Sequence, residues 1–126
     1  MPRLAAVALL LSTAFPIAAH AAMCVVDGET LEIRDHLVPD DNAYFVADET
    51  GAKLEWVINN EPLFADDQTY RKYGLTRVVS IDEIEFNGWV GGVPLFKAKG
   101  DPEVPQVVYL LTNPLKCEVQ PYQKAP

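Results

Sequence analysis

The two cysteines of this 126-residue chain lie near its opposite ends and place the strongest constraint on its fold. Cys24 and Cys117 are the only cysteines, so they can pair completely if the chain meets an oxidising compartment. The chain-entropy relation puts the stabilisation from closing so long a loop at about 4 to 5 kcal/mol as an upper figure. We therefore predict a disulfide that joins the first strand of the fold to one of the last.

The first 21 residues have the layout of a secretory signal peptide. A basic start at Arg3 precedes an uncharged apolar run over residues 4–19, which ends in the triplet Ala19-His20-Ala21. This run is shorter than the roughly 20 apolar residues that a membrane-spanning helix needs. We predict cleavage after Ala21 and a periplasmic or secreted product with no membrane span.

A lipid anchor at Cys24 is the alternative to the disulfide. The peptidase that matures bacterial lipoproteins cuts directly before a cysteine, usually after a small residue and with a larger aliphatic residue three positions before the cysteine. Met23 and Ala21 occupy these two positions, and both depart from the pattern. The disulfide is therefore favoured, and a lipoprotein is the minority alternative.

The acidic balance of the mature chain limits its partners. Removal of Arg3 with the signal peptide leaves 9 of the 10 basic residues against 18 acids, so the formal net charge becomes 9 minus 18, or −9. Such a chain repels nucleic acid and anionic lipid, and it attracts a basic protein or peptide. Solubility alone also accounts for a charge of this size.

Length and patterning predict a single β-rich domain over residues 22–119, with a tail over 120–126. Short segments of alternating apolar and polar residues are separated by turn residues, which is typical of an antiparallel barrel or sandwich. Asp27-Gly28 predicts a two-residue hairpin turn. Gly91-Gly92 predicts another, which would place Trp89 opposite Pro94 near a sheet edge.

Four other segments complete the expected fold. Residues 43–47 and 52–59 are expected to be strands of one hairpin, and residues 107–111 are apolar on both faces, as in a central strand. Residues 65–74 predict the single short helix, because Asp66 can cap its start and Gly74 follows its end. The expected class is therefore all-β, a small barrel or sandwich with one short helix, closed by a terminal disulfide.

The candidate contact surface for a protein or peptide is aromatic. Trp89, Pro94 and Phe96 share one face of the predicted hairpin, and aromatic residues near an edge supply binding area at low entropic cost. The same face fits the core instead if a bulge at residues 87–88 turns Phe86 inward. The acidic candidates for steering a basic partner are Asp40, Asp41, Asp66 and Asp67.

The mature chain has few candidate residues for nucleophilic catalysis or metal binding. The mature chain has one serine, Ser80, and one histidine, His36, whose neighbour Asp35 would point to the opposite face of a strand. The oxygen-rich segments 40–42 and 48–49 lack the spacing of a calcium loop, and turn formation explains them. We expect no metal, no cofactor and no catalytic residue.

The sequence therefore predicts an exported, non-enzymatic module of a bacterial-type cell envelope that binds a protein or peptide through a sheet edge or a loop. A small acidic inhibitor of a cationic hydrolase is one concrete form. The alternatives are a small secreted hydrolase that uses two carboxylates and a structural envelope component.

Overall fold

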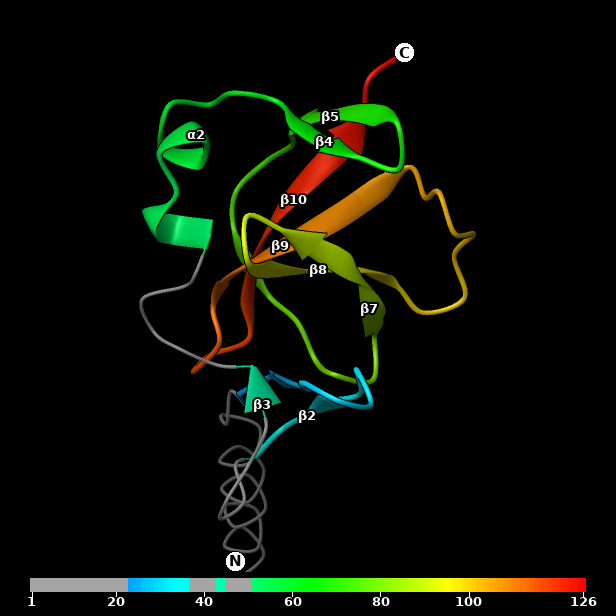
Figure 1. Ribbon diagram of the computed structural model, residues 1–126. Helices are drawn as coiled ribbons and strands as arrows, with labels where there is room; N and C mark the ends of the chain where they lie inside the picture. Colours follow the sequence, from blue (N-terminus) through cyan, green and yellow to red (C-terminus); the bar gives the residue numbers. More distant parts are fainter. Residues whose placement is uncertain (1–22, 37–42, 45–50) are drawn as a thin grey trace, which may run out of the picture.

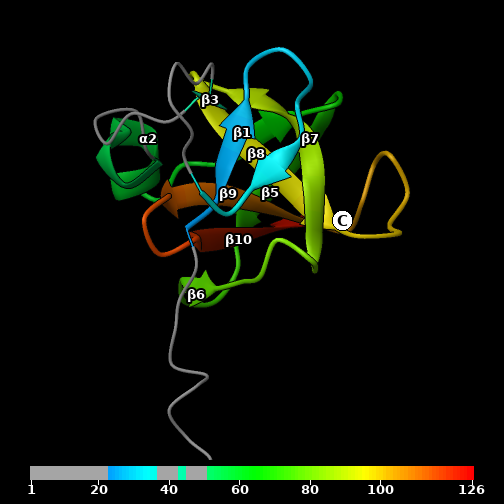
Figure 2. The same ribbon diagram turned by 90° about the horizontal axis from the view of Figure 1, so that it is seen from below.

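Two antiparallel sheets make up the computed structural model, which describes residues 23–36, 43–44 and 51–126 (Figure 1). The larger sheet has the strand order β4-β5-β10-β9-β8-β7, with β6 also paired to β10, and it curls into a half-barrel. The smaller sheet, β2-β1-β3, lies at the end of the half-barrel away from β4 and β5 (Figures 1 and 2). The predicted mainly antiparallel β class is confirmed. The sheet is an open half-barrel, which is closer to the barrel than to the sandwich of the two predicted alternatives.

The strands have the following bounds. The smaller sheet contains β1 (Val25–Asp27), β2 (Ile33–Arg34) and β3 (Ala43–Tyr44). The larger sheet contains β4 (Leu63–Ala65), β5 (Gln68–Lys72), β6 (Arg77–Val78), β7 (Ile84–Val90), β8 (Val93–Ala98), β9 (Val107–Asn113) and β10 (Glu118–Lys124).

A disulfide joins Cys24, just before β1, to Cys117, just before β10, as predicted. The two Cα atoms lie 4.9 Å apart, and both side chains are buried. The backbone N–H of Cys24 also donates to the carbonyl oxygen of Pro114, at 2.9 Å. The bridge therefore fastens the small sheet to the turn between β9 and β10.

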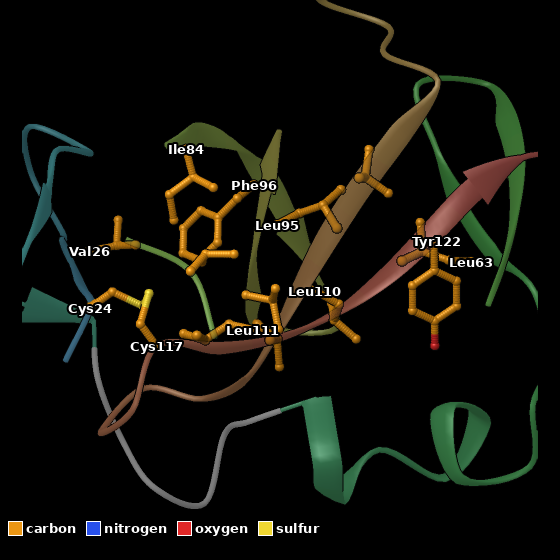
Figure 3. Packing of buried hydrophobic residues seen from close by; sticks show 14 of the residues in the cluster. Cys24, Val26, Leu63, Ile84, Leu95, Phe96, Leu110, Leu111, Cys117 and Tyr122 are labelled. Atoms are coloured by element: carbon orange, nitrogen blue, oxygen red, sulfur yellow. A yellow bond between two sulfur atoms is a disulfide. The ribbon is translucent and has the colours of Figure 1, made fainter. Parts of the chain in front are cut away.

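One continuous core runs from the disulfide to β4. Figure 3 shows Val26 near the bridge and Leu63 beside Tyr122 at the other end. Strand β8, which lies between β7 and β9 in the sheet, is buried on both faces from Val93 to Phe96. Strand β9 is central in the sheet, as its apolar sequence predicts, but it is not fully covered on both faces: Val108 and Leu110 are buried, whereas Val107 and Tyr109 on the other face are half-buried.

The helix predicted over residues 65–74 is wrong, because these residues form the β4–β5 hairpin. Asp66 and Asp67 are the two turn residues, with φ of 51° and 60°, a left-handed conformation that Asp tolerates better than most residues. Beyond the turn, Tyr70 is fully buried and its hydroxyl donates to the carbonyl oxygen of Pro105 at 2.9 Å. Burial of Tyr70 outweighs the capping signals of a helix of barely two turns.

The strand predicted over residues 52–59 is also wrong. A 3₁₀ turn (Gly51–Lys53) and the short helix α2 (Glu55–Ile58) occupy most of this segment, with Val57 buried. The ammonium group of Lys72 on β5 donates to the carbonyl oxygen of Val57, at 2.8 Å, and so satisfies a carbonyl at the end of the helix. Periodicity does not separate a strand from a helical turn in so short an apolar segment.

The Gly91-Gly92 hairpin is confirmed. The two glycines have φ of 60° and 80°, and the register places Val90 opposite Val93 and Trp89 opposite Pro94. A bulge shifts the register between Phe86 and Gly88, at the position where one was considered. Pro94 is tolerated in this interior strand because the pairing of β8 with β9 begins one residue later, at Leu95.

The hairpin predicted at Asp27-Gly28 exists, but its turn is longer than two residues. Strands β1 and β2 are joined through residues 28–32. One carboxylate oxygen of Asp27 accepts the backbone N–H groups of Glu29 and Thr30, at 2.8 and 3.0 Å. Leu31 then reverses the chain with a φ of 63°, so side-chain capping by Asp27 replaces the expected tight turn.

The C-terminal residues belong to the sheet, which corrects the expected tail over 120–126. Strand β10 runs to Lys124, and Tyr122 within it is fully buried. Pro121 is accommodated within β10 because it lies between the residues that pair with β6 and those that pair with β5. There its carbonyl oxygen accepts the backbone N–H of Tyr73, at 2.9 Å.

Candidate binding groove

The aromatic surface predicted from sequence is divided between core and surface. Phe96 and Pro94 are buried, so their side chains are not available to a partner. Trp89 is 40% exposed, and its ring lies edge-on to Phe86 with ring centroids 5.1 Å apart. The bulge at residues 87–88 places Phe86 on the same face, opposite Phe96. Most of the expected surface is interior because this face packs into the core cluster.

The acidic candidates also separate. Asp66 and Asp67 are exposed at the β4–β5 turn. Asp40 and Asp41 lie outside the described residues, as do the expected signal peptide and the oxygen-rich segments 40–42 and 48–49. The structure therefore provides one of the two expected acidic clusters for a binding site.

An apolar groove lies between β4, helix α2 and the tip of the β7–β8 hairpin. Its volume is about 310 Å³. The lining residues are Trp56, Glu61, Pro62, Leu63, Phe64 and Val90. We call it the β4 groove. Because β4 and β7 are the two end strands of the sheet, it lies where the half-barrel is open.

The walls of the β4 groove are held in place by the core. Leu63 is buried beside Tyr122, whose ring points toward α2 (Figure 3) and lies 6.1 Å from the Trp56 ring, centroid to centroid. The hairpin tip packs on the same segment, since a Cβ placed on Gly91 would lie 3.6 Å from the side chain of Leu54. The groove is therefore largely preformed, which lowers the entropic cost of binding.

An acidic hollow adjoins the β4 groove. It has a volume of about 420 Å³ and is lined by residues 64–69, so Phe64 belongs to both concavities. The Phe64 side chain is 68% exposed, a large apolar surface between Glu61 on one side and the Asp66-Asp67 turn on the other. Burial, and then the Asp66 carboxylate, raise the pKa of the nearby Tyr70 above its ordinary value.

A buried phenol lies next to the groove wall. Among the described residues, the Tyr122 hydroxyl has no hydrogen-bond partner. Burial disfavours the phenolate and raises the pKa of Tyr122 to about 12. This group is a structural element of the core rather than a reactive one at neutral pH.

The candidate residues for nucleophilic catalysis, Ser80, His36 and Asp35, do not form a catalytic arrangement. Nδ1 of His36 lies 2.8 Å from a carboxylate oxygen of Asp35, so the expectation that these neighbours point apart is wrong. That hydrogen bond lowers the pKa of Asp35, but both side chains are exposed. Ser80 accepts the backbone N–H of Asp82 at 3.2 Å, and no hydrogen bond between described residues joins it to His36.

Two further findings concern residues 23–36, 43–44 and 51–126 only. No group of three or more His, Cys, Asp or Glu side chains in these ranges is arranged to hold a metal ion. No helix in them is long and apolar enough to cross a membrane.

None of the apolar lining residues of the β4 groove was a site candidate from sequence. A strand over residues 52–59 and a helix over residues 65–74 give no reason for Trp56 to lie near Leu63 and Phe64. One usable signal is present, because Phe64 is a large aromatic residue two positions before an acidic pair. Val90 reaches the groove only through the curl of the sheet.

The chain matches no protein-family model, no curated protein and no solved structure. Its function is therefore inferred from the geometry of the β4 groove and the charges around it.

Proposed function

We propose that this protein is an exported, non-enzymatic binding module that captures an extended, basic segment of a partner protein in the β4 groove. The observation that carries the proposal is the meeting of an apolar groove and an acidic hollow at the exposed side chain of Phe64. An apolar side chain of the partner would lie in the groove, and a lysine or arginine two residues away would reach Asp66 and Asp67.

The dimensions favour a short peptide segment. The groove volume is at the lower end of the range of about 300 to 1,000 Å³ that is usual for ligand sites, which suits one or two side chains. Exposed aromatic residues such as Phe64 supply large contact area for little loss of side-chain entropy. The formal net charge of −8 for the whole chain adds long-range attraction for a basic partner.

Two features support export. The first 21 residues have signal-peptide layout, and the buried disulfide is of the kind that persists in an oxidising compartment. We place the protein in the periplasm or outside the cell on these grounds. A small inhibitor of a cationic hydrolase is one form that such a binder can take.

The test uses a defined set of pentapeptides and the mature, oxidised protein. The peptides have the patterns Thr-Lys-Thr-Z-Thr and Thr-Z-Thr-Lys-Thr, where Z is Val, Ile, Leu, Met or Phe, with both ends blocked. We expect saturable shifts of the Phe64 amide and the Trp56 indole NMR signals with at least one peptide. Affinity should fall at least about threefold between low salt and 0.5 M NaCl, because charges on exposed groups are screened.

Variants locate the site. Asp66→Asn with Asp67→Asn should weaken lysine peptides about five- to tenfold, as expected for the loss of charge pairs at a partly exposed site. The matched control, Asp82→Asn with Glu32→Gln, removes the same charge from exposed positions at the end of the half-barrel away from β4 and β5 and should change affinity less than about twofold. If no peptide shows saturable binding, the proposal is overturned. If peptides bind but neither salt nor the Asp66 and Asp67 substitutions change the affinity, the part of the proposal that specifies a basic partner is wrong.

A further inference from the structure

We infer that the captured segment binds as an additional antiparallel strand along the outer edge of β4, with a basic residue two positions before an apolar one. This inference rests on the proposed function and adds the backbone geometry and the sequence order of the ligand.

The hydrogen-bonding pattern of the β4–β5 hairpin identifies the available backbone groups. Ala65 and Gln68 flank its two-residue turn and so form a hydrogen-bonded pair. Pairs alternate along an antiparallel ladder, so Phe64 and Thr69 form a non-hydrogen-bonded pair. The N–H and C=O groups of Phe64 therefore point away from β5, toward the open edge.

This edge is short and bounded on both sides. Within the described part of the chain only β5 pairs with β4. Pro62, two residues before Phe64, has no N–H to offer, and the turn begins at Asp66, two residues after it. The N–H of Phe64 is thus the one backbone donor of β4 that points outward between Pro62 and the turn, and a partner strand that pairs with Phe64 exchanges two hydrogen bonds with it in a single register.

The register assigns the neighbouring side chains of the partner. In the strand pairings, Leu63 lies on the same face as Tyr70 and Tyr122. Through the pairings of β7 to β10, Val90 projects from that face as well. A partner residue opposite Leu63 would share this face and enter the groove between Trp56 and Val90.

The acids then set the direction. The partner residue opposite Ala65 lies two positions from the one opposite Leu63, so both project to the same side. Ala65 precedes the Asp66-Asp67 turn, which favours a basic residue at that place. Antiparallel pairing is slightly more stable per residue than parallel pairing, and it places the basic residue before the apolar one in the partner sequence.

The experiment compares backbone-methylated peptides. In Thr-Lys-Thr-Ile-Thr, methylation of the central Thr nitrogen removes the donor to the Phe64 carbonyl and should weaken binding at least about fivefold. Methylation of the Ile nitrogen alters an N–H that points away from β4 and should change affinity less than about twofold. The reversed order, Thr-Ile-Thr-Lys-Thr, should bind more weakly than the first.

Protein variants test the same bonds from the other side. Phe64→Pro removes the outward N–H while leaving the bonds of β4 to β5 intact, and Phe64→Ala changes the side chain alone. The proline variant should bind more weakly than the alanine variant, with matching NMR spectra confirming the fold of both. If the two methylated peptides bind equally, or if the reversed order binds better, strand addition is overturned while groove capture stands. If no peptide binds, both proposals fail.

Discussion

The two hairpins at the ends of the large sheet have similar turns, but they differ in the burial of their phenylalanine side chains. Both β4–β5 and β7–β8 close with two residues at positive φ. The Gly91-Gly92 turn leads into β8, which is buried from Val93 to Phe96, whereas the Asp66-Asp67 turn follows β4, whose Phe64 is 68% exposed. Both hairpins therefore contribute to the core, since Leu63 and Tyr70 of β4–β5 are also buried, but the β4–β5 hairpin in addition places the exposed Phe64 beside acids.

Substitution of the two phenylalanines gives the largest expected contrast. Phe96→Ala should lower the free energy of unfolding by about 3 to 5 kcal/mol, because it leaves a cavity in a fully packed core. Phe64→Ala should change it by about 0.5 kcal/mol or less, since most of that side chain already contacts water. Denaturant titration of the oxidised proteins measures both. Similar losses of stability in the two variants would show that Phe64 is covered in solution, and would contradict the contrast between the two hairpins.

High pH should lower the free energy of unfolding, because the phenol groups of Tyr70 and Tyr122 are buried at and beside the β4–β5 hairpin. Tyr122 has an ordinary pKa of 10.0 when unfolded and about 12 when folded, so the unfolded state loses its proton first. Its contribution to stability is therefore complete below pH 10 and is lost as the pH rises from about 10 to 12, by about 2 to 3 kcal/mol.

Tyr122→Phe should remove most of this alkaline loss and leave stability at pH 7 unchanged or slightly higher, because the deleted hydroxyl has no hydrogen-bond partner among the described residues. Tyr70, whose pKa is also raised, accounts for part of what is left. Unfolding midpoints measured from pH 8 to 12 provide the check. An unchanged alkaline fall in the variant would contradict the role of Tyr122.

The turn residues give the smallest effects, with opposite signs. Gly91→Ala should destabilise by about 1 kcal/mol, because φ of 60° is unfavourable for a residue with a Cβ atom. Asp67→Gly should stabilise by up to about 1 kcal/mol, since Asp-Gly suits this turn better than Asp-Asp. Thermal unfolding compares the two. Destabilisation by Asp67→Gly would mean that its carboxylate contributes more to the turn than its strained backbone costs.

The accuracy of the sequence-based predictions followed the strength of local signals. The β7–β8 hairpin was predicted in register because the two-residue turn with positive φ suits few residue pairs, of which Gly-Gly is one, and because Val, Trp, Leu and Phe alternate around it. The segment 65–74 was assigned to a helix because its charges fit helix ends, although each such preference contributes only a fraction of a kcal/mol at an exposed site. The buried contacts of Leu63 and Tyr70 with β10 contribute more, and these contacts are not visible in the segment itself.

The candidate site was harder to predict than the fold. Asp66 and Asp67 were identified as acidic candidates, yet their neighbours in the β4 groove come from three separate segments. Conversely, Pro94 and Phe96 share a face with Trp89 as predicted, but neighbouring elements bury two of the three. Sharing a face is a property of one strand, whereas exposure depends on what packs against it.

By itself, the sequence determined the β class, the pairing of its only two cysteines and the register of the glycine hairpin. The β class follows from local periodicity, and the hairpin register follows from a turn that few residues can form. The disulfide follows because two cysteines allow only one pairing. The tertiary structure alone decided that residues 55–58 are helical, that residues 65–74 form a hairpin and that Phe64 stays exposed beside a groove. The physical reason is that these segments are short, so their own preferences are weak, and burial against distant strands selects their conformation.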